Sequence, residues 1–169
     1  MKLTQLLERL KYEVVQGDDQ IEVTELINDS RKVTEGSVFV CISGAVSDGH
    51  AYVQQVAEKG AAAVIVEKDV EAPEGLTVIK VENTRYALAL TSAAYFGYPA
   101  EKLKVIGITG TKGKTTTTYM VKSILEEVGI KVGLIGTIEV IIGDKSIPAN
   151  NTTPESYTIQ KYFSEMVEE

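Results

Sequence analysis

The stretch that most constrains the fold is the glycine-rich segment at residues 105–116, VIGITGTKGKTT. A short apolar run opens it, and apolar residues at helical spacing follow from Tyr119 onward. This order of strand, loop and helix is typical of a phosphate-binding loop, in which main-chain N–H groups and a helix N-terminus surround an anion. The sequence therefore predicts a strand over residues 105–109, an anion-binding loop, and a helix that runs to about Val128.

Two side chains of this loop have the chemistry to hold a nucleotide. Lys114 can reach the outer phosphates as a point charge, and the Thr115 hydroxyl can ligate the magnesium ion that accompanies ATP. Gly110 and Gly113 can adopt positive φ and bring the backbone close to phosphate oxygens. The general pattern G-x-x-x-x-G-K-[ST] has glycine where this chain has Ile108, so the loop is a variant of it. The alternative is a glycine-rich turn that precedes a helix and binds nothing.

The composition indicates an ordinary globular chain with an acidic net charge. Its 169 residues are 44% hydrophobic and 24% charged, with a net charge of −7 and a pI near 4.9. This charge argues against nonspecific binding to nucleic acid or acidic membranes. No apolar run approaches the ~20 residues of a membrane span, and the first residues do not resemble a signal peptide. With a single cysteine, Cys41, we expect a cytoplasmic protein and a buried, unreactive thiol.

Alternating strands and helices predict an α/β fold with some parallel pairing. In the first half, the predicted strands cover residues 38–42, 62–66 and 76–81, and the predicted helices cover 3–10, 51–59 and 85–96. Asn83 or Thr84 is the expected cap of the last of these helices. After the glycine-rich loop we expect a strand over residues 131–137, a hairpin over 138–147, and a final helix with Pro154 in its first turn.

The break Gly97-Tyr98-Pro99 and the charged stretch 101–104 indicate a boundary between two domains. We assign residues 1–100 to a small N-terminal α/β domain and residues 101–169 to the first part of a phosphate-loop domain. The second domain is unfinished, because nucleotide hydrolysis needs several parallel strands and an acidic magnesium ligand. Asp144 follows an apolar run, but Gly-Asp-Lys is a turn signal first. We therefore expect this chain to be the N-terminal part of a longer protein.

Several motifs together resemble one protein family. The loop at residues 107–116 is similar to the ATP loop of the Mur ligases, ATP-dependent amide-forming enzymes that build the peptide of bacterial cell-wall precursors. Lys112 is a departure, since the family more often has asparagine there. The other motifs resemble the member that extends UDP-N-acetylmuramoyl-L-alanyl-D-glutamate, and they are Asp29-Ser30-Arg31, Gly36-x-Val38-Phe39-Val40, Asp48-Gly49-His50, Gly60-Ala61-x-Ala63-Val64 and Asn151-Thr152-Thr153-Pro154-Glu155.

The resemblance implies a three-domain ligase, of which this chain supplies the uridine-nucleotide domain and the opening of the ATP domain. Such a ligase adds L-lysine or meso-diaminopimelate to its precursor through an acyl phosphate, with ATP and Mg²⁺. Its partners are UDP-N-acetylmuramoyl-dipeptide and an amino acid, without nucleic acid or membrane, and we expect a monomer. The chain alone is expected to be inactive. Which amino acid is added stays open, because that pocket lies in the C-terminal domain.

The resemblance also implies roles for individual residues. ATP would be held by Gly110, Thr111, Lys112, Gly113, Lys114, Thr115 and Thr116, with Thr115 on magnesium and Lys114 the one residue given a catalytic role. The UDP-precursor would contact Ser30, His50, Asn151, Thr152 and Thr153. Structural interpretations stay open beside these: a turn with a surface ion pair at residues 29–31, a hydrogen-bonded ring at His50, and a helix cap at residues 151–153.

Two other functions remain possible at this point. One is a ligase like folylpolyglutamate synthase, which shares the Gly-Thr-x-Gly-Lys loop but usually continues with Gly-Ser and lacks a leading uridine domain. Thr115-Thr116 and the N-terminal domain count against it. The other is a binding module that senses a nucleotide without catalysing ligation. It would bind ATP and ignore UDP-sugars.

Overall fold

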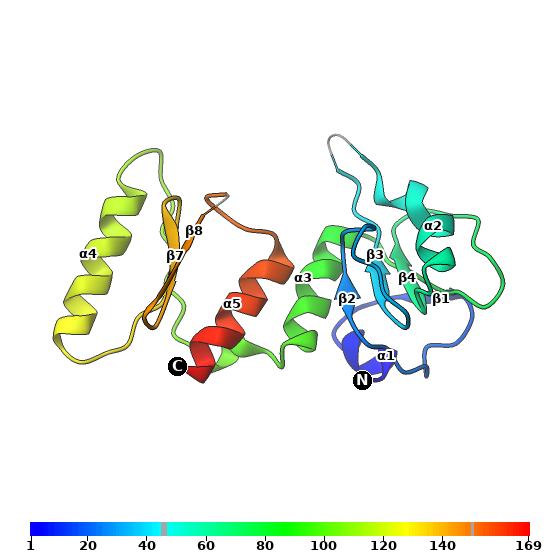
Figure 1. Ribbon diagram of the computed structural model, residues 1–169, viewed down its shortest axis with the longest axis horizontal. Coiled ribbons are helices and arrows are strands. Elements are labelled where there is room, and N and C mark those ends of the chain that lie inside the picture. The colour runs from blue at the N-terminus through cyan, green and yellow to red at the C-terminus, as the bar shows by residue number, and fades with distance from the viewer. Residues whose placement is uncertain (45–46, 150) are drawn as a thin grey trace. The chain divides into compact units, whose positions relative to one another are not determined.

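Residues 1–44, 47–149 and 151–169 are described in a computed structural model of the chain (Figure 1). The chain divides into two compact units, Met1–Tyr95 and Phe96–Glu169. The expected domain boundary lay after residue 100, whereas residues 96–100 belong to the second unit in the structure. The ring of Phe96 meets the ring of Tyr157 edge to face there, with centroids 5.2 Å apart.

The first unit is built on a five-stranded sheet. Its strands are β1 (Glu13–Gln16), β2 (Leu26–Ile27), β3 (Val38–Val40), β4 (Ala63–Val66) and β5 (Thr77–Lys80), in the order β1-β5-β4-β3-β2. Strands β2 to β5 run parallel, and β1 pairs antiparallel with β5. The continuous apolar runs of β3 and β4 are fully buried, as parallel strands covered on both faces require.

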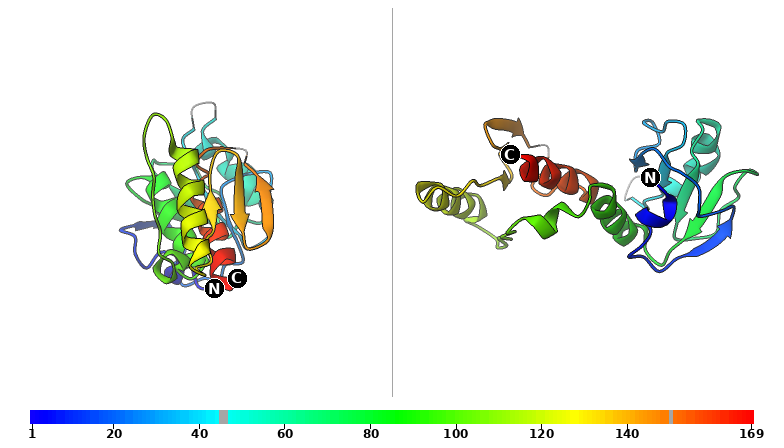
Figure 2. Two further views of the ribbon diagram at one scale, coloured as in Figure 1. Left: turned by 90° about the vertical axis from the view of Figure 1, so that its left-hand side faces the viewer. Right: turned by 90° about the horizontal axis from the view of Figure 1, so that it is seen from below.

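Helices cover both faces of this sheet (Figures 1 and 2). Successive side chains of a strand alternate between the faces, so Phe39, Cys41 and Val64 share one face and form a buried cluster with Val53 and Val56 of α2 (Val53–Glu58). The other face packs against α3 (Thr84–Tyr95), which in turn contacts α1 (Leu3–Leu6). The 3₁₀-helix η1 (Gly49–Tyr52) leads into α2.

This unit confirms the predicted α/β class with parallel pairing and most of the predicted elements. Asn83 caps α3, because its side-chain oxygen accepts a hydrogen bond from the Tyr86 N–H at 2.8 Å. Cys41 is buried, and its burial raises the pKa of the thiol to about 12. Its thiol is therefore unreactive at neutral pH, as expected. The helix predicted over residues 3–10 is shorter and ends at Leu6.

The described residues of the second unit form three helical segments and a small antiparallel sheet. They are η2 (Pro99–Lys102), α4 (Lys114–Glu127), β6 (Leu134–Ile135), β7 (Glu139–Ile142), β8 (Lys145–Pro148) and α5 (Ser156–Glu168). The sheet has the order β6-β7-β8, and β7 and β8 form the predicted hairpin around Gly143 and Asp144. The α5 helix packs on η2 and β7. Pro154 precedes this helix rather than lying in its first turn.

The predicted strand over residues 105–109 is wrong. These residues form no strand, and Val105 and Ile106 are 56% and 63% exposed. The strand predicted over residues 131–137 shrinks to the two residues of β6. A strand needs a hydrogen-bonded neighbour, since its main-chain groups are otherwise left to water. The described part of the second unit supplies no neighbour for residues 105–109.

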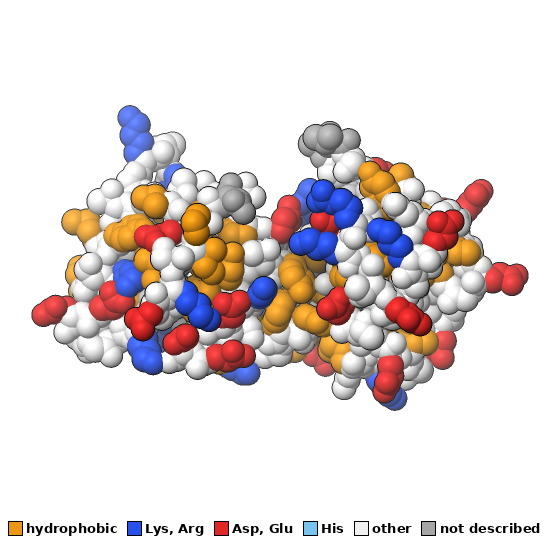
Figure 3. Space-filling model, viewed as in Figure 1, with side chains coloured by type: hydrophobic (Ala, Val, Ile, Leu, Met, Phe, Trp, Pro, Cys, Tyr) orange, Lys and Arg blue, Asp and Glu red, His pale blue; other side chains and the backbone are white. Residues whose placement is uncertain are grey.

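The α4 helix contacts β6, but no described element buries it. None of its residues is buried, and its apolar residues Met120 and Ile124 are 62% and 67% exposed, followed by Val128 at 68%. An open groove of about 750 Å³ runs along this face, lined by α4 together with Ile138 and Glu139. Hydrophobic side chains are visible on the surface of this unit in Figure 3. Among the described residues, no helix combines the length and apolar character needed to cross a bilayer.

Candidate functional site

The glycine-rich loop ends at a helix N-terminus, as its sequence predicts. Gly113 is the N-cap of α4 with φ of 78°, and Gly110 has φ of 151°. Both values lie in the region that L side chains rarely adopt, so glycine is required here for its backbone freedom. The Thr117 N–H makes the first helical hydrogen bond, to the Gly113 carbonyl at 2.9 Å. The N–H groups of Lys114, Thr115 and Thr116 thus belong to the turn that a helix leaves without internal acceptors.

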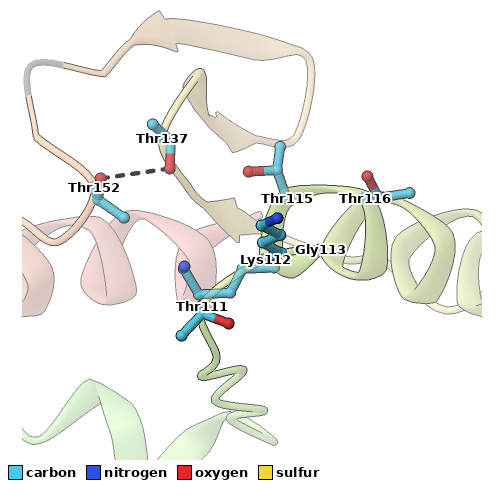
Figure 4. Close-up of a pocket in the computed structure, with 8 residues that line it drawn as sticks. Thr111, Lys112, Gly113, Thr115, Thr116, Thr137 and Thr152 are labelled. Atoms are coloured by element: carbon cyan, nitrogen blue, oxygen red, sulfur yellow. Dashed lines mark hydrogen bonds between the residues drawn. The ribbon is translucent and has the colours of Figure 1, made fainter.

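A cleft of about 260 Å³ opens at this helix end (Figure 4). It is lined by residues 111–116 together with Thr137 and Thr152. Pockets that enclose a whole small-molecule ligand usually measure about 300–1,000 Å³. The cleft therefore has the size for a phosphate chain rather than for a complete nucleotide.

The lining of the cleft suits an anion with a magnesium ion. Lys112 and Lys114 bring positive charge, and the threonines bring hydroxyl groups. The Lys114 Nζ donates a hydrogen bond to the Gly110 carbonyl at 2.6 Å, so the ammonium group folds back over the loop. No acidic side chain lines the cleft, and the described residues contain no cluster of three or more His, Cys, Asp or Glu suited to a metal. The lysines and hydroxyls present fit the phosphates of ATP, and the Thr115 hydroxyl is a group of the kind that ligates magnesium.

The structure brings one predicted substrate residue to this cleft. Thr152 lies in the loop after β8, and its Oγ1 is 3.4 Å from Oγ1 of Thr137, which follows β6. Asn151 and Thr153 are exposed and do not line the cleft. In Figure 4, Thr111 and Lys112 come from the loop and Thr115 and Thr116 from the start of α4.

The predicted site residue Ser30 lies in the first unit, shortly after β2 ends. It is half-buried, and its carbonyl accepts a hydrogen bond from the Lys59 Nζ at 2.7 Å. On either side of it, Arg31 donates two side-chain hydrogen bonds to Asp29, from Nε at 2.9 Å and from Nη2 at 2.8 Å. These bonds lower the pKa of Asp29 to about 2. The ion pair of the structural interpretation is thus present, and the Ser30 hydroxyl keeps its predicted role as a proposal.

The His50 ring is buried and engaged at both nitrogens. Its Nδ1 is 2.6 Å from Oδ1 of Asp48, and its Nε2 accepts the Glu67 N–H at 3.1 Å. Because the main-chain N–H can only donate, the Nδ1 must carry the ring proton and donate it to Asp48. The ring therefore offers no free hydrogen-bonding atom to a ligand. The predicted contact of His50 with substrate remains a prediction, and the arrangement agrees with the structural interpretation of this residue.

The Glu67 carboxylate links the start of α3 to the carboxyl ends of strands β3 and β4. Its Oε2 accepts the Thr84 N–H at 2.9 Å and the Thr84 hydroxyl at 2.8 Å, and its Oε1 accepts the Ser43 hydroxyl at 2.8 Å. The Thr84 N–H is the main cause that lowers the pKa of Glu67. The Lys68 ammonium likewise lowers the pKa of Asp48. This network, which fixes the start of α3 against the ends of β3 and β4, was not anticipated from the sequence.

Thr137 was also missed by the sequence reasoning. A signal for it exists, because Gly136-Thr137 directly follows the short apolar strand after the phosphate-loop helix. Polar residues at the ends of strands near a phosphate loop are candidates for ligand contacts. The shortness of β6 made this strand end difficult to locate from the sequence.

Comparison with protein-family models gave two matches. Residues 22–96 match "Mur ligase family, catalytic domain" and residues 108–169 match "Mur ligase middle domain". The chain resembles the UDP-N-acetylmuramoyl-L-alanyl-D-glutamate--2,6-diaminopimelate ligase of Clostridium perfringens, with 48% identity over 99% of this chain and 35% of the relative. The UDP-N-acetylmuramoyl-L-alanyl-D-glutamate--2,6-diaminopimelate ligase 1 of Clostridium acetobutylicum is 50% identical, over 99% of this chain and 35% of the relative. The chain thus spans about a third of the length of these relatives.

A solved structure agrees with these matches. The crystal structure of MurF from Acinetobacter baumannii superposes with a TM-score of 0.60 and 28% identity, over 97% of this chain and 32% of MurF. The two family models together leave only residues 1–21 and 97–107 unmatched. The chain therefore belongs to the Mur ligase family, and it carries sequence of the N-terminal and middle domains of that family.

Proposed function

We propose that this chain is the N-terminal part of an ATP-dependent ligase that joins an amino acid to UDP-N-acetylmuramoyl-L-alanyl-D-glutamate. The observation that carries this proposal is the cleft in which Thr152, from the predicted substrate loop, lies beside the predicted ATP loop. The names of the two Clostridium relatives favour 2,6-diaminopimelate over lysine as the added amino acid.

The reaction needs a carboxylate to become reactive toward an amine. ATP would transfer its terminal phosphoryl group to the carboxylate of the precursor, and the amine would then displace phosphate to form the amide. The protein has to align the reacting groups and neutralise their charge, without supplying a nucleophile. The cleft suits this task, since its side chains are lysines and threonines.

Different residues of the cleft would align the phosphates and neutralise their charge. The N–H groups at the start of α4 and the positive end of the helix dipole would hold the phosphates. Lys114 would leave the Gly110 carbonyl and neutralise the charge that develops on the outer phosphates. The Thr115 hydroxyl would ligate magnesium. Gly110, Thr111, Lys112, Gly113 and Thr116 would shape the cradle around the phosphate chain.

We assign the first unit to the uridine end of the precursor. Ser30 would contact it, and the loop ordered by His50 would lie at the same edge of the parallel sheet, where ligands of such sheets bind. Asn151, Thr152 and Thr153 would meet the muramoyl-peptide part from the second unit. We further propose a cytoplasmic monomer.

Calorimetric titration of the 169-residue chain with UDP-N-acetylmuramoyl-L-alanyl-D-glutamate tests the uridine assignment. We expect weak binding that Ser30→Ala reduces about three- to tenfold, the range for one lost hydrogen bond. Ser164→Ala, the same chemical change on α5, serves as the control and leaves the affinity unchanged. Equal affinities of the wild type and Ser30→Ala would remove Ser30 from the site.

A coupled phosphate-release assay with ATP, the precursor and diaminopimelate tests the expectation that the chain alone is inactive. We expect no turnover, because the chain spans about a third of the length of its relatives, and the resemblance puts the acidic metal ligand and the amino-acid pocket in the other part. Turnover by the 169-residue chain would contradict this part of the proposal. Tight binding of ATP without any response to the UDP-precursor would instead favour a nucleotide-sensing module.

A further inference from the structure

Two threonine hydroxyls from separate segments meet at the mouth of the cleft. Oγ1 of Thr137 is 3.4 Å from Oγ1 of Thr152, and both residues line the cleft together with Thr115 and Thr116. The dashed line in Figure 4 marks this contact. A separation of 3.4 Å is long for two hydroxyls, which prefer about 2.7–2.8 Å. A small movement of either loop would therefore strengthen the contact.

Main-chain hydrogen bonds place Thr137 and Thr152 beside the same end of the β7–β8 hairpin. The Ala149 N–H donates to the Ile138 carbonyl at 3.1 Å, and the Gly136 N–H donates to the Glu139 carbonyl at 3.1 Å. Pairing of β7 with β8 places Glu139 opposite Pro148. The loops that carry Thr137 and Thr152 thus leave the sheet from the same end of the hairpin, next to the start of α4.

The chemistry of a hydroxyl suits a link between two loops. It has one donor and two acceptor positions, so Thr137 can either donate to Thr152 or accept from it. No cation would be needed for this link, and the nearby lysines stay available for the phosphates.

We propose that Thr137 is a positioning residue that couples the phosphate loop to the substrate loop through Thr152. It would hold the substrate loop so that the acceptor carboxylate and the terminal phosphate of ATP meet in one cleft. This inference rests on the proposed ligase function, and it adds a residue that the sequence motifs do not include. Thr137 acts through Thr152, so its loss changes alignment and leaves nucleotide affinity intact.

The test uses a chimera in which this chain replaces the matching 35% of the Clostridium perfringens ligase. Thr137→Val removes the hydroxyl and keeps the shape, Thr137→Ser keeps the hydroxyl, and Thr117→Val on α4 is the matched control outside the cleft. We expect Thr137→Val to raise the KM for the UDP-precursor or lower kcat by about tenfold, with the KM for ATP within twofold. Thr137→Ser and Thr117→Val should behave as the unsubstituted chimera.

These outcomes separate the inference from the function on which it rests. An unsubstituted chimera that binds Mg·ADP but fails to ligate would overturn the ligase function. Normal kinetics of Thr137→Val, equal damage by Thr137→Ser, or a parallel loss of ATP affinity would each overturn the coupling role of Thr137.

A second measurement applies to the 169-residue chain itself. Addition of Mg·ADP should shift the backbone amide NMR signal of Thr152 in the wild type and in Thr137→Ser. The shift should be lost in Thr137→Val, while the amide signals of residues 113–116 still respond. A Thr152 response that persists in Thr137→Val would show that the loops are coupled without this hydroxyl.

Discussion

At the scale of single residues, Glu67 orders the first unit. Its carboxylate accepts three hydrogen bonds from Ser43 and Thr84, and its main-chain N–H bonds the His50 ring. Thr84 is fully buried, so its N–H and hydroxyl would lose their acceptor if Glu67 were truncated. Buried donors left without a partner cost about 1–3 kcal/mol each in folding stability.

We predict that Glu67→Ala lowers the free energy of unfolding by at least about 2 kcal/mol at pH 7, the lower bound for the two buried Thr84 donors. The pKa of Glu67 is lowered in the folded chain. Its stabilising effect is therefore complete above the unfolded pKa of about 4.3 and is lost as the pH falls through the lower folded pKa. The difference between wild type and variant should shrink below about pH 4. Urea denaturation at a series of pH values measures this difference in unfolding free energy, with Glu74→Ala as the exposed control.

A stability difference that stays constant down to low pH would contradict the role of the ionised carboxylate. A difference no larger than that of the control would mean that the Thr84 donors find another acceptor.

At the scale of elements, apolar runs predicted strands correctly in the first unit and incorrectly in the second. The apolar runs at β3, β4 and β5 predicted their strands, because each has a parallel neighbour within the unit. The apolar run at residues 105–109 did not become a strand. Residue pattern specifies which face a strand buries, but a strand also needs a partner, and that information lies outside the run itself.

The α4 and α3 helices offer a matched test of this difference. Ile124 on α4 is 67% exposed, whereas Leu88 on α3 is 1% exposed. We predict that Ile124→Gln changes the unfolding free energy of the chain by less than about 0.5 kcal/mol. Leu88→Ala should lower it by about 2–5 kcal/mol, since it leaves a cavity in a packed core. Chemical denaturation of both variants provides the comparison.

A loss above about 1 kcal/mol for Ile124→Gln would contradict the exposure of α4. It would mean that this face is covered in solution, and sedimentation at several concentrations would show whether a second copy covers it.

At the scale of the whole molecule, the glycine-rich loop could be predicted from sequence, because its glycines and its Lys-Thr pair have local causes. The contact between Thr137 and Thr152 could not, since it joins segments 15 residues apart through the pairing of a hairpin. The same holds for His50, whose ring is engaged by Glu67 across 17 residues. The sequence identifies candidate binding residues, but which of them lie close together depends on tertiary contacts that no local pattern specifies.

The central claim is that the loop at the start of α4 holds the phosphates of a magnesium nucleotide. Titration calorimetry of the 169-residue chain with Mg·ADP tests it most directly. We predict binding of one Mg·ADP per chain that Lys114→Met weakens about 10- to 100-fold, as expected for a charge-assisted hydrogen bond, while Lys145→Met on β8 leaves it unchanged. Absence of Mg·ADP binding, or equal affinity of Lys114→Met and the wild type, would contradict the claim.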